Sequence, residues 1–554
     1  MNNDKITVVN AENVNEFKSM KSENISPSNE IKKKKVKDSS FNPPATKTMD
    51  SETSKKRKLS KNEDISQQKV GDISVKISPL SKKLKVNHDI IVNESHKGSI
   101  AVGEESLKWI ISPHKTKKFL NQYFEKNVLH IQRNDKDYYK HVFSCKSFDK
   151  LLRNSEKPLI YGKNIDITSY TEKEGRETHT PEGGRAHAAV VWDYYTNGCS
   201  IRIINPQTFS DPVWKLCSDL QDYFGSMVGA NVYLTPPGTQ GFAPHFDDVD
   251  VFILQLEGKK HWRLYEPNDN DKLPRFSSRN FTQEEIGKPF LETTLSAGDF
   301  LYMPRGTIHQ GYCLEDIHSL HITISCHQRN TYGDLLEKAL STAIASAMKN
   351  DVDFRKGLPV DYLSFMGKVH CNKESTKRNE FIKHVTYLAS KVIDVVAIDT
   401  GADLMGKRFV HDTLPPYLTP SESDRCVENG GEKWHSGKSK VVNRVEMEPD
   451  TTVRLIRANC IRLVEDVDKS YKLYYNVDNT REYHEVGEDP NFLEIDEDTM
   501  PCVQALIQAY PNFLAIEKLP IEDLEQKMKI AQDMWEKKLL MTEERLEPFK
   551  FDDD

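Results

Sequence analysis

One pair of residues limits the architecture of this chain more than any other feature of its sequence. His245 and Asp247 stand two positions apart in PHFDDVDVFILQLEGKKHWRLY, which alternates and then becomes continuously apolar, as a buried strand does. Side chains two positions apart leave a strand on the same face, so both can reach one metal ion. His309 follows Asp247 by 62 residues, after the predicted strand FLYMP and a Pro-Arg-Gly turn. Two imidazoles and one carboxylate predict the facial triad of a non-haem Fe(II) oxygenase.

The three-ligand assignment is weighed against ordinary structural roles. An H-x-D pair alone is a weak signal, but its place at the head of an apolar run favours fixed metal ligands. Besides His309, the third ligand could be His318 or His321, which precede and enter the strand HITIS, or His327, which follows it. A supporting or structural role for His318 or His321 stays open. Asp248 falls on the opposite strand face and is expected to contact solvent or to support the ligands.

A buried lysine is the second requirement of such a site, because the usual cosubstrate of this iron is 2-oxoglutarate, whose distal carboxylate needs a cation. The segment EGKK predicts a turn into the strand HWRLY. In an alternating strand, Lys260 lies on the same face as the apolar residues Trp262 and Leu264, whereas Lys259 lies on the opposite face. We expect Lys260 to hold the carboxylate and Lys259 to lie at the surface. Two solvated turn lysines would be the ordinary alternative.

The strand pattern predicts an α+β protein built around a double-sheet jelly roll of the cupin kind. Short strands are expected at AAVVWDYY, CSIRII, ANVYL, VFILQL, HWRLY, DFLYMP and HITIS, separated by Gly and Pro. Ordered structure is expected to begin near Leu107, and KTKKFLNQYFEKNVLHIQR predicts an amphipathic helix leading into a strand.

Helical periodicity follows the jelly roll. Apolar residues at helical spacing predict helices over Tyr332–Lys349 and Lys377–Val396. The C-terminal part predicts a small α/β module, with a hairpin at RLVEDVDKSYKLYYNVD and helices around Met500–Tyr510 and Glu522–Lys537.

Charge is unevenly distributed along the chain. Residues 1–100 hold 20 Lys/Arg against 13 Asp/Glu and few aromatic residues, which predicts a disordered basic region. Its clusters KKKK, KKRK and KKLK favour nuclear import over a merely solubilising tail, with retention in the nucleolus as a consequence. The nine cysteines form no C-x-x-C pair, so neither a zinc finger nor a disulfide framework is indicated, as expected in a reducing compartment. No apolar run approaches the ~20 residues of a membrane helix, so no membrane partner is expected.

Taken together, these motifs resemble the JmjC ribosomal oxygenases of the nucleolar type, bifunctional enzymes that combine lysine demethylation with histidyl hydroxylation. The resemblance extends over about Leu107 to Met541. It is carried by NVYLTPPGTQGFAPHFDDVD, VFILQLEGKKHWRLY, GDFLYMPRGTIHQ, HSLHITIS, QRNTYGDLLEKAL, FRKGLP and HDTLPP.

The resemblance implies a set of site residues. It makes His245, Asp247 and His309 the Fe(II) ligands and Lys260 a 2-oxoglutarate contact. It also implies that Asn231, Tyr233 and Ser325 form hydrogen bonds with the target residue, and that Arg202 lies close to the substrate channel. From the residues alone, each of these last four would more readily be taken for packing, a strand end or an ion pair.

The resemblance also implies a domain plan and partners. It divides the chain into a basic region (1–100), an N-terminal part of the catalytic domain (101–190), a JmjC domain (191–345), a helical dimerisation region (346–419) and a winged-helix-like domain (420–554). It implies a homodimer. Residues 421–554 hold 31 Asp/Glu against 18 Lys/Arg, so we expect this module to bind proteins rather than to bind DNA strongly.

Two protein substrates follow from the resemblance: a histidine of a large-subunit ribosomal protein and methylated lysines of histone H3, with effects on ribosome biogenesis and transcription. The pair Asn231 and Tyr233 suits an imidazole better than a trimethylammonium, which an aromatic cage usually holds, so the histidine is favoured. Two alternatives remain: a catalytically inactive JmjC scaffold or chromatin-binding protein, and a metal cupin that does not use 2-oxoglutarate, such as a zinc isomerase.

Overall fold

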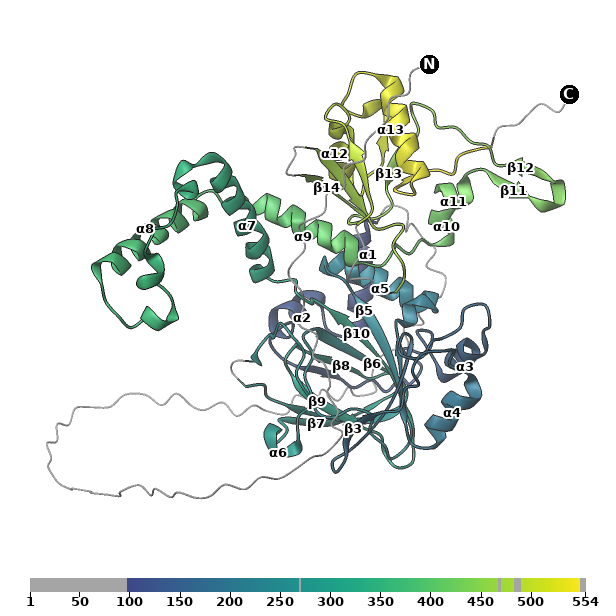
Figure 1. Cartoon of the computed structure of the whole chain (residues 1–554). Coiled ribbons are helices and arrows are strands. Elements are labelled where there is room, and N and C mark those ends of the chain that lie inside the picture. The colour runs from purple at the N-terminus through teal and green to yellow at the C-terminus, as the bar shows by residue number, and fades with distance from the viewer. Residues whose placement is uncertain (1–96, 269–270, 467–469, 483–489, 549–554) are drawn as a thin grey trace, which may run out of the picture. The chain divides into compact units, whose positions relative to one another are not determined.

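The computed structural model describes residues 97–268, 271–466, 470–482 and 490–548 (Figure 1). The three basic clusters that predict nuclear import lie outside these ranges. None of the helices within the described ranges is long and apolar enough to cross a membrane.

Ten strands within the described ranges form the predicted jelly roll, and they pair antiparallel throughout. Eight pair in the order β1-β8-β6-β10-β5-β4-β2-β3, while β7 and β9 both pair with the second half of β6. The strands are β1 (Leu129–Ile131), β2 (Ile165–Thr171), β3 (Gly175–Thr178), β4 (Ser200–Ile204), β5 (Gly229–Thr235), β6 (Asp250–Tyr265), β7 (Leu291–Ser296), β8 (Phe300–Met303), β9 (Ile308–Tyr312) and β10 (Ser319–Cys326).

The long strand β6 joins the two halves of this arrangement. Its first half pairs with β8 and β10, and its second half pairs with β7 and β9. The predicted turn at EGKK is therefore wrong, because the chain bends there without leaving the strand. Gly258 makes the bend with a φ of +65°, and a Cβ on this residue would lie 1.7 Å from the carbonyl oxygen of His318. Only glycine fits this bend, which a sequence pattern does not distinguish from a turn.

Helices cover the sheets and complete the main core. They are α1 (Ser99–Ile111), α2 (Thr116–Gln122), α3 (Cys145–Arg153), α4 (Ala188–Thr196), α5 (Asp211–Phe224) and α6 (Gln283–Ile286). Leu107 and Ile110 of α1 and Leu220 of α5 belong to one buried cluster with Val232 of β5 and Ile322 of β10. The apolar face of the central strands therefore packs against helices, while the opposite face is left to line a cavity.

Two expectations for this part are wrong. The segment AAVVWDYY forms helix α4 rather than a strand: Ala188 and Val191 are buried, three positions apart, and Val190 is exposed. A short run of β-branched and aromatic residues fits both periods, and packing decides between them. Ordered structure also begins before Leu107, since α1 starts at Ser99. Its Gly103 lets α1 approach α5 so closely that a Cβ would lie 2.2 Å from a backbone oxygen of Asp219.

Helices α7 (Tyr332–Asn350) and α8 (Thr376–Ile393) confirm the two predicted helices, and a third, α9 (Ile398–Asp412), follows them (Figure 1). Helix α7 begins with a capping box, in which the Thr331 side chain accepts a hydrogen bond from the Asp334 backbone N–H and the Asp334 carboxylate accepts one from Thr331. This cap starts the helix directly after β10.

The C-terminal module has a core of its own, separate from that of the jelly roll. The predicted hairpin is β14–β15, and the two predicted helices are α12 and α13. Its elements are α10 (Pro420–Ser423), α11 (Val427–Gly430), β11 (Lys433–His435), β12 (Lys440–Val442), β13 (Thr452–Leu455), β14 (Ile461–Glu465), β15 (Tyr471–Tyr475), β16 (Phe492–Ile495), α12 (Met500–Ala509), β17 (Leu514–Ala515), α13 (Leu524–Glu536) and β18 (Leu540–Thr542). The amide of Gln221 in α5 ties its start to the jelly roll by donating to the carbonyl oxygen of Leu414 at 2.8 Å.

Candidate functional site

The backbone brings two histidines that are far apart in sequence directly opposite each other. His245 lies just before β6 and His309 lies on β9, and the two residues form an isolated antiparallel bridge. The His245 N–H donates to the His309 carbonyl oxygen at 3.2 Å, and the reverse hydrogen bond is 2.8 Å long. Their rings are consequently fixed with centroids 4.6 Å apart.

Asp247 completes a group of three potential metal ligands with these histidines. One carboxylate oxygen lies 3.9 Å from Nε2 of His245, and the other lies 3.8 Å from Nε2 of His309. The three ligand atoms all lie within 4.8 Å of one another. The structure therefore brings together the three residues that the H-x-D spacing and the distal histidine singled out.

Each imidazole has the tautomer that a metal requires. Nδ1 of His245 lies 2.8 Å from the carbonyl oxygen of Ala243, and Nδ1 of His309 lies 3.0 Å from that of Thr307. A carbonyl only accepts hydrogen bonds, so each Nδ1 carries the proton and each Nε2 keeps a free lone pair. Burial, together with the nearby His245, lowers the pKa of His309 to about 4, so its ring is neutral at physiological pH. The donor set fits a divalent metal such as Fe(II).

A cavity of about 240 Å³ opens beside these three side chains. Lys260 is buried in its wall, while its neighbour Lys259 is exposed, as alternation predicted. Burial lowers the pKa of Lys260 to about 8, and the ammonium donates a hydrogen bond to the Thr235 hydroxyl at 3.3 Å. The ammonium also lies 5.3 Å from the centroid of the Trp262 ring, and both of these partners are neutral. Such a buried ammonium fits a carboxylate ligand, which would supply a negative charge.

Of the four residues expected to contact the target, Tyr233 and Arg202 line this cavity. The Tyr233 ring stacks on the His321 ring at 4.9 Å, and burial raises the pKa of its phenol, which therefore stays protonated. Arg202 forms an ion pair with Asp166 on the neighbouring strand. Tyr233 thus offers a hydrogen-bond donor directly at the cavity wall.

Asn231 and Ser325 are not among the residues that line the cavity. Asn231 shares a face of β5 with Tyr233, and its Oδ1 is buried without a hydrogen-bond partner. Ser325 lies near the end of β10, paired with Gly229 and Val251. Their contact with a target residue stays a prediction.

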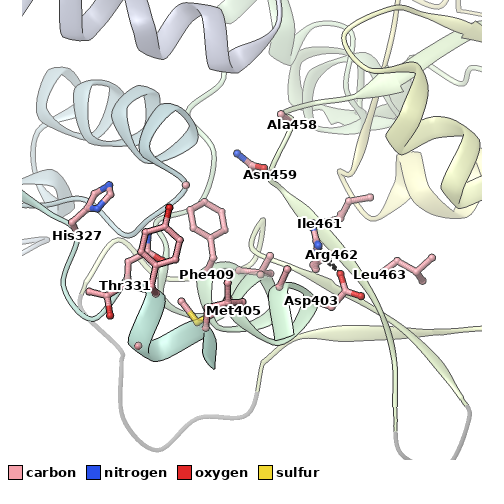
Figure 2. Close-up of a pocket in the computed structure, with 18 of the residues that line it drawn as sticks. His327, Thr331, Asp403, Met405, Phe409, Ala458, Asn459, Ile461, Arg462 and Leu463 are labelled. Atoms are coloured by element: carbon pink, nitrogen blue, oxygen red, sulfur yellow. Dashed lines mark hydrogen bonds and ion pairs between the residues drawn. The ribbon is translucent and has the colours of Figure 1, made fainter. Parts of the chain in front are cut away.

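The competing histidines are placed elsewhere or turned to other partners. His318 Nε2 lies 3.3 Å from the Glu257 carboxylate, outside the cavity. His321 lines the cavity but is not part of the ligand group. His327 lines a second and larger cavity, of about 1110 Å³, together with Phe409 and Asn459 (Figure 2). The geometry therefore selects His309 from the four candidates.

The larger cavity is bounded by α9 and β14 and contains the Arg462–Asp403 ion pair (Figure 2). Within the described ranges, no group of three potential metal ligands lies among its lining residues. We therefore assign the chemistry to the smaller cavity, because it is lined by the three potential metal ligands, although its volume is the smaller of the two.

Several residues of the site have no local signal in the sequence. Arg176 on β3 lines the cavity and lies in none of the motifs quoted above. Phe242 and Gln310 also line it and lie within two of those motifs, but nothing in their spacing assigns them to the site. Asp248 is buried rather than solvated: its carboxylate accepts hydrogen bonds from the Ser277 hydroxyl at 2.7 Å and from the Gln328 amide at 2.9 Å. It therefore supports the loop beside the ligands, one of its two expected roles.

Two family models match separate parts of the chain. The JmjC domain model matches residues 202–335, and the model of the ribosomal oxygenase 1 C-terminal winged helix domain matches residues 414–546. Ribosomal oxygenase 1 of Danio rerio is 47% identical over 441 residues, covering 79% of this chain and 80% of the relative. The bifunctional lysine-specific demethylase and histidyl-hydroxylase NO66 of Dictyostelium discoideum is 44% identical, covering 83% and 88%.

Among solved structures, the X-ray structure of Escherichia coli ycfD matches 77% of this chain and 98% of its own, with 16% identity and a TM-score of 0.43.

Proposed function

This chain belongs to the ribosomal oxygenase 1 and NO66 family of JmjC proteins, and we propose that it is an Fe(II)- and 2-oxoglutarate-dependent oxygenase that hydroxylates a histidine of a large-subunit ribosomal protein. The observation that carries the proposal is the convergence of His245, Asp247 and His309 beside a cavity whose wall contains the buried Lys260. Demethylation of methylated lysines in histone H3 is the second candidate activity.

His245, Asp247 and His309 would hold the metal, and Lys260 would hold the distal carboxylate of 2-oxoglutarate. When bound, the iron and its cosubstrate supply the oxidant for a C–H bond of the target residue. The chain's own contribution is geometric. The carbonyl groups of Ala243 and Thr307 fix the two ring orientations, and the two backbone hydrogen bonds between His245 and His309 fix their separation.

The rest of the cavity positions the target and excludes water. Tyr233 in the cavity wall is protonated and can donate a hydrogen bond. Asn231 lies on the same face of β5 but does not line the cavity; its buried Oδ1 has no hydrogen-bond partner among the described residues and would accept a hydrogen bond from a target that reaches it. An unpaired buried acceptor is costly, so a donor on the substrate would relieve that cost. A neutral imidazole provides both a donor and an acceptor, which matches this pair.

The cavity is less suited to a methylated ammonium group. Such cations are held on the open faces of aromatic rings. Here the guanidinium of Arg176 already lies over the ring of Phe242, at 4.5 Å from its centroid, and that of Arg202 lies 5.8 Å from the same ring. A trimethylammonium would meet the positive charge of Arg176 at this wall, since that of Arg202 is paired with Asp166. We therefore favour the histidine substrate.

Parallel reactions with two peptides test the choice. The iron-loaded protein is incubated with 2-oxoglutarate and either a histidine peptide from a large-subunit ribosomal protein or a methylated histone H3 peptide. Mass spectrometry should show the gain of one oxygen atom on the histidine peptide. Loss of a methylene mass from the histone peptide alone would reverse the preference. Failure of the iron-loaded protein to bind 2-oxoglutarate would favour a metal cupin of another class.

A homodimer formed through the helical region is part of the proposal. The segment that includes α7 and α8 exposes several large apolar side chains: Tyr332 (87% exposed), Val360 (107%), Leu363 (72%) and Val369 (84%). Covering such side chains is favourable at about 25 cal/mol per Å² of apolar surface. A second copy of the chain is the occupant that the family resemblance implies.

The winged-helix module is proposed to bind proteins rather than DNA. Its 31 acidic residues against 18 basic ones over 421–554 would repel a phosphate backbone. Because the module has its own core, it can be tested as a fragment comprising residues 414–554. We expect no retardation of duplex DNA by this fragment at physiological salt. Micromolar binding would contradict the proposal.

Nuclear, and specifically nucleolar, localisation is proposed from the clusters KKKK, KKRK and KKLK of the N-terminal region. Replacing the lysines and arginine of all three clusters with glutamine in a fluorescent fusion should leave the protein in the cytoplasm. Unchanged nucleolar signal in this variant would contradict the assignment.

A further inference from the structure

We propose that Arg176 binds a carboxylate of the peptide substrate, so that the enzyme selects peptides with an acidic residue close to the residue that it oxidises. The inference rests on the proposed oxygenase function and adds a specificity determinant to it. Four observations carry it: the position of Arg176 at the cavity, its lack of an acidic partner, the local charge balance and the geometry of its guanidinium.

Arg176 lies on the edge strand β3, and its exposed side chain contributes to the rim of the catalytic cavity. Its guanidinium lies over the Phe242 ring at 4.5 Å, and this ring packs edge-on against Tyr233 at 5.5 Å. Phe242 also lies 6.3 Å from the ring of His245, centroid to centroid. One aromatic ring therefore separates the guanidinium from a potential metal ligand, so a group bound to Arg176 would belong to a residue close to the target residue.

Within the described ranges, Arg176 has neither a hydrogen bond nor an ion pair with an acidic side chain. Asp166, whose charge acts on Arg176, does not line the cavity and is paired with Arg202. Glu177 is next on the strand, and alternation turns it to the opposite face, where its carboxylate lies 3.9 Å from His179. Partial burial, followed by the like charge of Arg202, lowers the pKa of Arg176, whereas Asp166 and Tyr233 oppose this effect. Among the described residues, the wall beside Arg176 therefore offers it no acidic side chain that is free to pair with it.

The charge balance of this wall selects the kind of anion. The charges of Arg202 and Asp166 cancel in their ion pair, which leaves the single positive charge of Arg176. A carboxylate carries one negative charge and matches the fork of a guanidinium with two parallel hydrogen bonds. A phosphate group, at about −1.5 to −2, would exceed the single positive charge available. A carboxylate on the peptide is thus the better match.

Charge-exchange peptides test this inference. The host is the histidine peptide of the ribosomal protein, with one glutamate placed in turn at each position flanking the histidine and compared with glutamine at the same position. Binding is measured by fluorescence anisotropy with Mn²⁺ and 2-oxoglutarate, and KM and kcat by mass spectrometry with iron. We expect one position at which glutamate binds about tenfold more tightly than glutamine, as expected for a charge-assisted pair at a partly solvated rim.

Arg176→Gln should abolish this preference and should raise KM for the preferred glutamate peptide more than KM for its glutamine counterpart, because it removes a binding contact to the carboxylate. Arg176→Lys should restore part of the preference. Lys173→Gln is the matched control, since it removes one exposed positive charge from the same hairpin, away from the cavity. Equal binding of all glutamate and glutamine pairs by the unsubstituted protein, or a preference that survives Arg176→Gln, would overturn the inference.

The binding measurement separates this inference from the proposed function. Anisotropy needs no turnover, so the glutamate preference can be present or absent whether or not the histidine gains oxygen. A preference without hydroxylation would refute the histidine as target and retain the role of Arg176. Hydroxylation of the histidine without a glutamate preference would support the histidine as target and refute the role of Arg176.

Discussion

The ammonium of Lys260 donates to the hydroxyl of Thr235 at 3.3 Å and is buried in the wall of the metal-side cavity. Burial lowers the pKa of this lysine to about 8, and Thr235 supplies no negative charge to restore it. In the absence of a ligand, the fold therefore carries a destabilising cation. A bound carboxylate would remove that cost, which ties cosubstrate affinity and stability to one side chain.

Lys260→Met is expected to have opposite effects on stability and binding. Removing the unpaired buried charge should stabilise the ligand-free protein by about 1–3 kcal/mol, from the pKa displacement of Lys260. It should weaken 2-oxoglutarate binding by about 30-fold or more, through loss of a charge pair. Thermal unfolding and calorimetric titration measure the two effects. Lys259→Met, an exposed neighbour, should change neither. A Lys260→Met protein that binds 2-oxoglutarate normally would refute the anchor.

The pH dependence of 2-oxoglutarate binding follows from the same group. Since the pKa of Lys260 is lowered to about 8, its proton is lost from the folded protein before it is lost from the unfolded chain. Affinity should be constant below about pH 7 and should weaken above pH 8, approaching tenfold per pH unit. Between about pH 8 and 10.5, this lysine should make the ligand-free fold more stable as pH rises. Affinity that is flat up to pH 10 in the unsubstituted protein would contradict this assignment.

Single substitutions of the ligands should abolish metal binding without unfolding the protein. His245→Ala, Asp247→Ala and His309→Ala each remove one of three ligands, so affinity should fall beyond the ~10–100-fold that loss of a supporting residue costs. Metal content after anaerobic loading is the measurement. His130→Ala is the control, because its ring contacts the Thr293 hydroxyl and belongs to neither group of three potential metal ligands among the described residues. His318 is unsuitable as a control, since it forms the second such group with Cys145 and Glu257. Unchanged metal content in the His309 variant would show that the third ligand is misassigned.

Gly258 should be far less tolerant of a side chain than another glycine with similar backbone geometry. Gly258→Ala places a Cβ 1.7 Å from a backbone oxygen of His318, at a φ of +65°. We expect a loss of folding stability on the order of 3 kcal/mol. Gly162→Ala is the matched control, because its φ is +74° but nothing lies within 4 Å of the new Cβ. It should cost about 1–2 kcal/mol. Equal melting temperatures for the two variants would contradict the close approach at β6.

Charged substitutions in the helical region test the dimer. Leu363→Asp combined with Val369→Asp should convert a dimer into a monomer in light scattering, because both side chains are exposed and apolar. Val190→Asp, at an exposed apolar position on α4, should leave the oligomeric state unchanged. A monomeric unsubstituted protein, or a dimer that survives the double substitution, would refute the proposed interface.

The metal ligands could be predicted because their signals are local. Lys260 follows from strand alternation, and the turn before His309 is visible in its own sequence. The predicted strand at His245 and Asp247 is wrong, because β6 begins only at Asp250; His245 forms an isolated bridge with His309, and Asp247 lies in irregular chain. The spacing of two positions nevertheless identified two residues that lie together in the ligand group. The helices α7 and α8 were predictable for the same reason, since their apolar faces repeat along each helix.

The features of the fold and the site that the sequence did not predict depend on tertiary packing. The segment that forms α4 has a strand-like composition, and only burial of Ala188 and Val191 against the core makes it a helix. The bend at Gly258 is indistinguishable from a turn until β7 and β9 are seen to pair with the same strand. Arg176 reaches the cavity from an edge strand whose partner had not been predicted, so no motif could have assigned it to the site.

The most direct measurement is succinate formation from 2-oxoglutarate by the anaerobically iron-loaded protein after oxygen is admitted, with the histidine peptide present. We predict succinate in step with oxygen gained by the histidine, and loss of both in the Asp247→Ala variant. Absence of succinate with either the histidine or the histone peptide, despite bound iron, would contradict the enzymatic account and favour a scaffold that uses the JmjC fold only for binding.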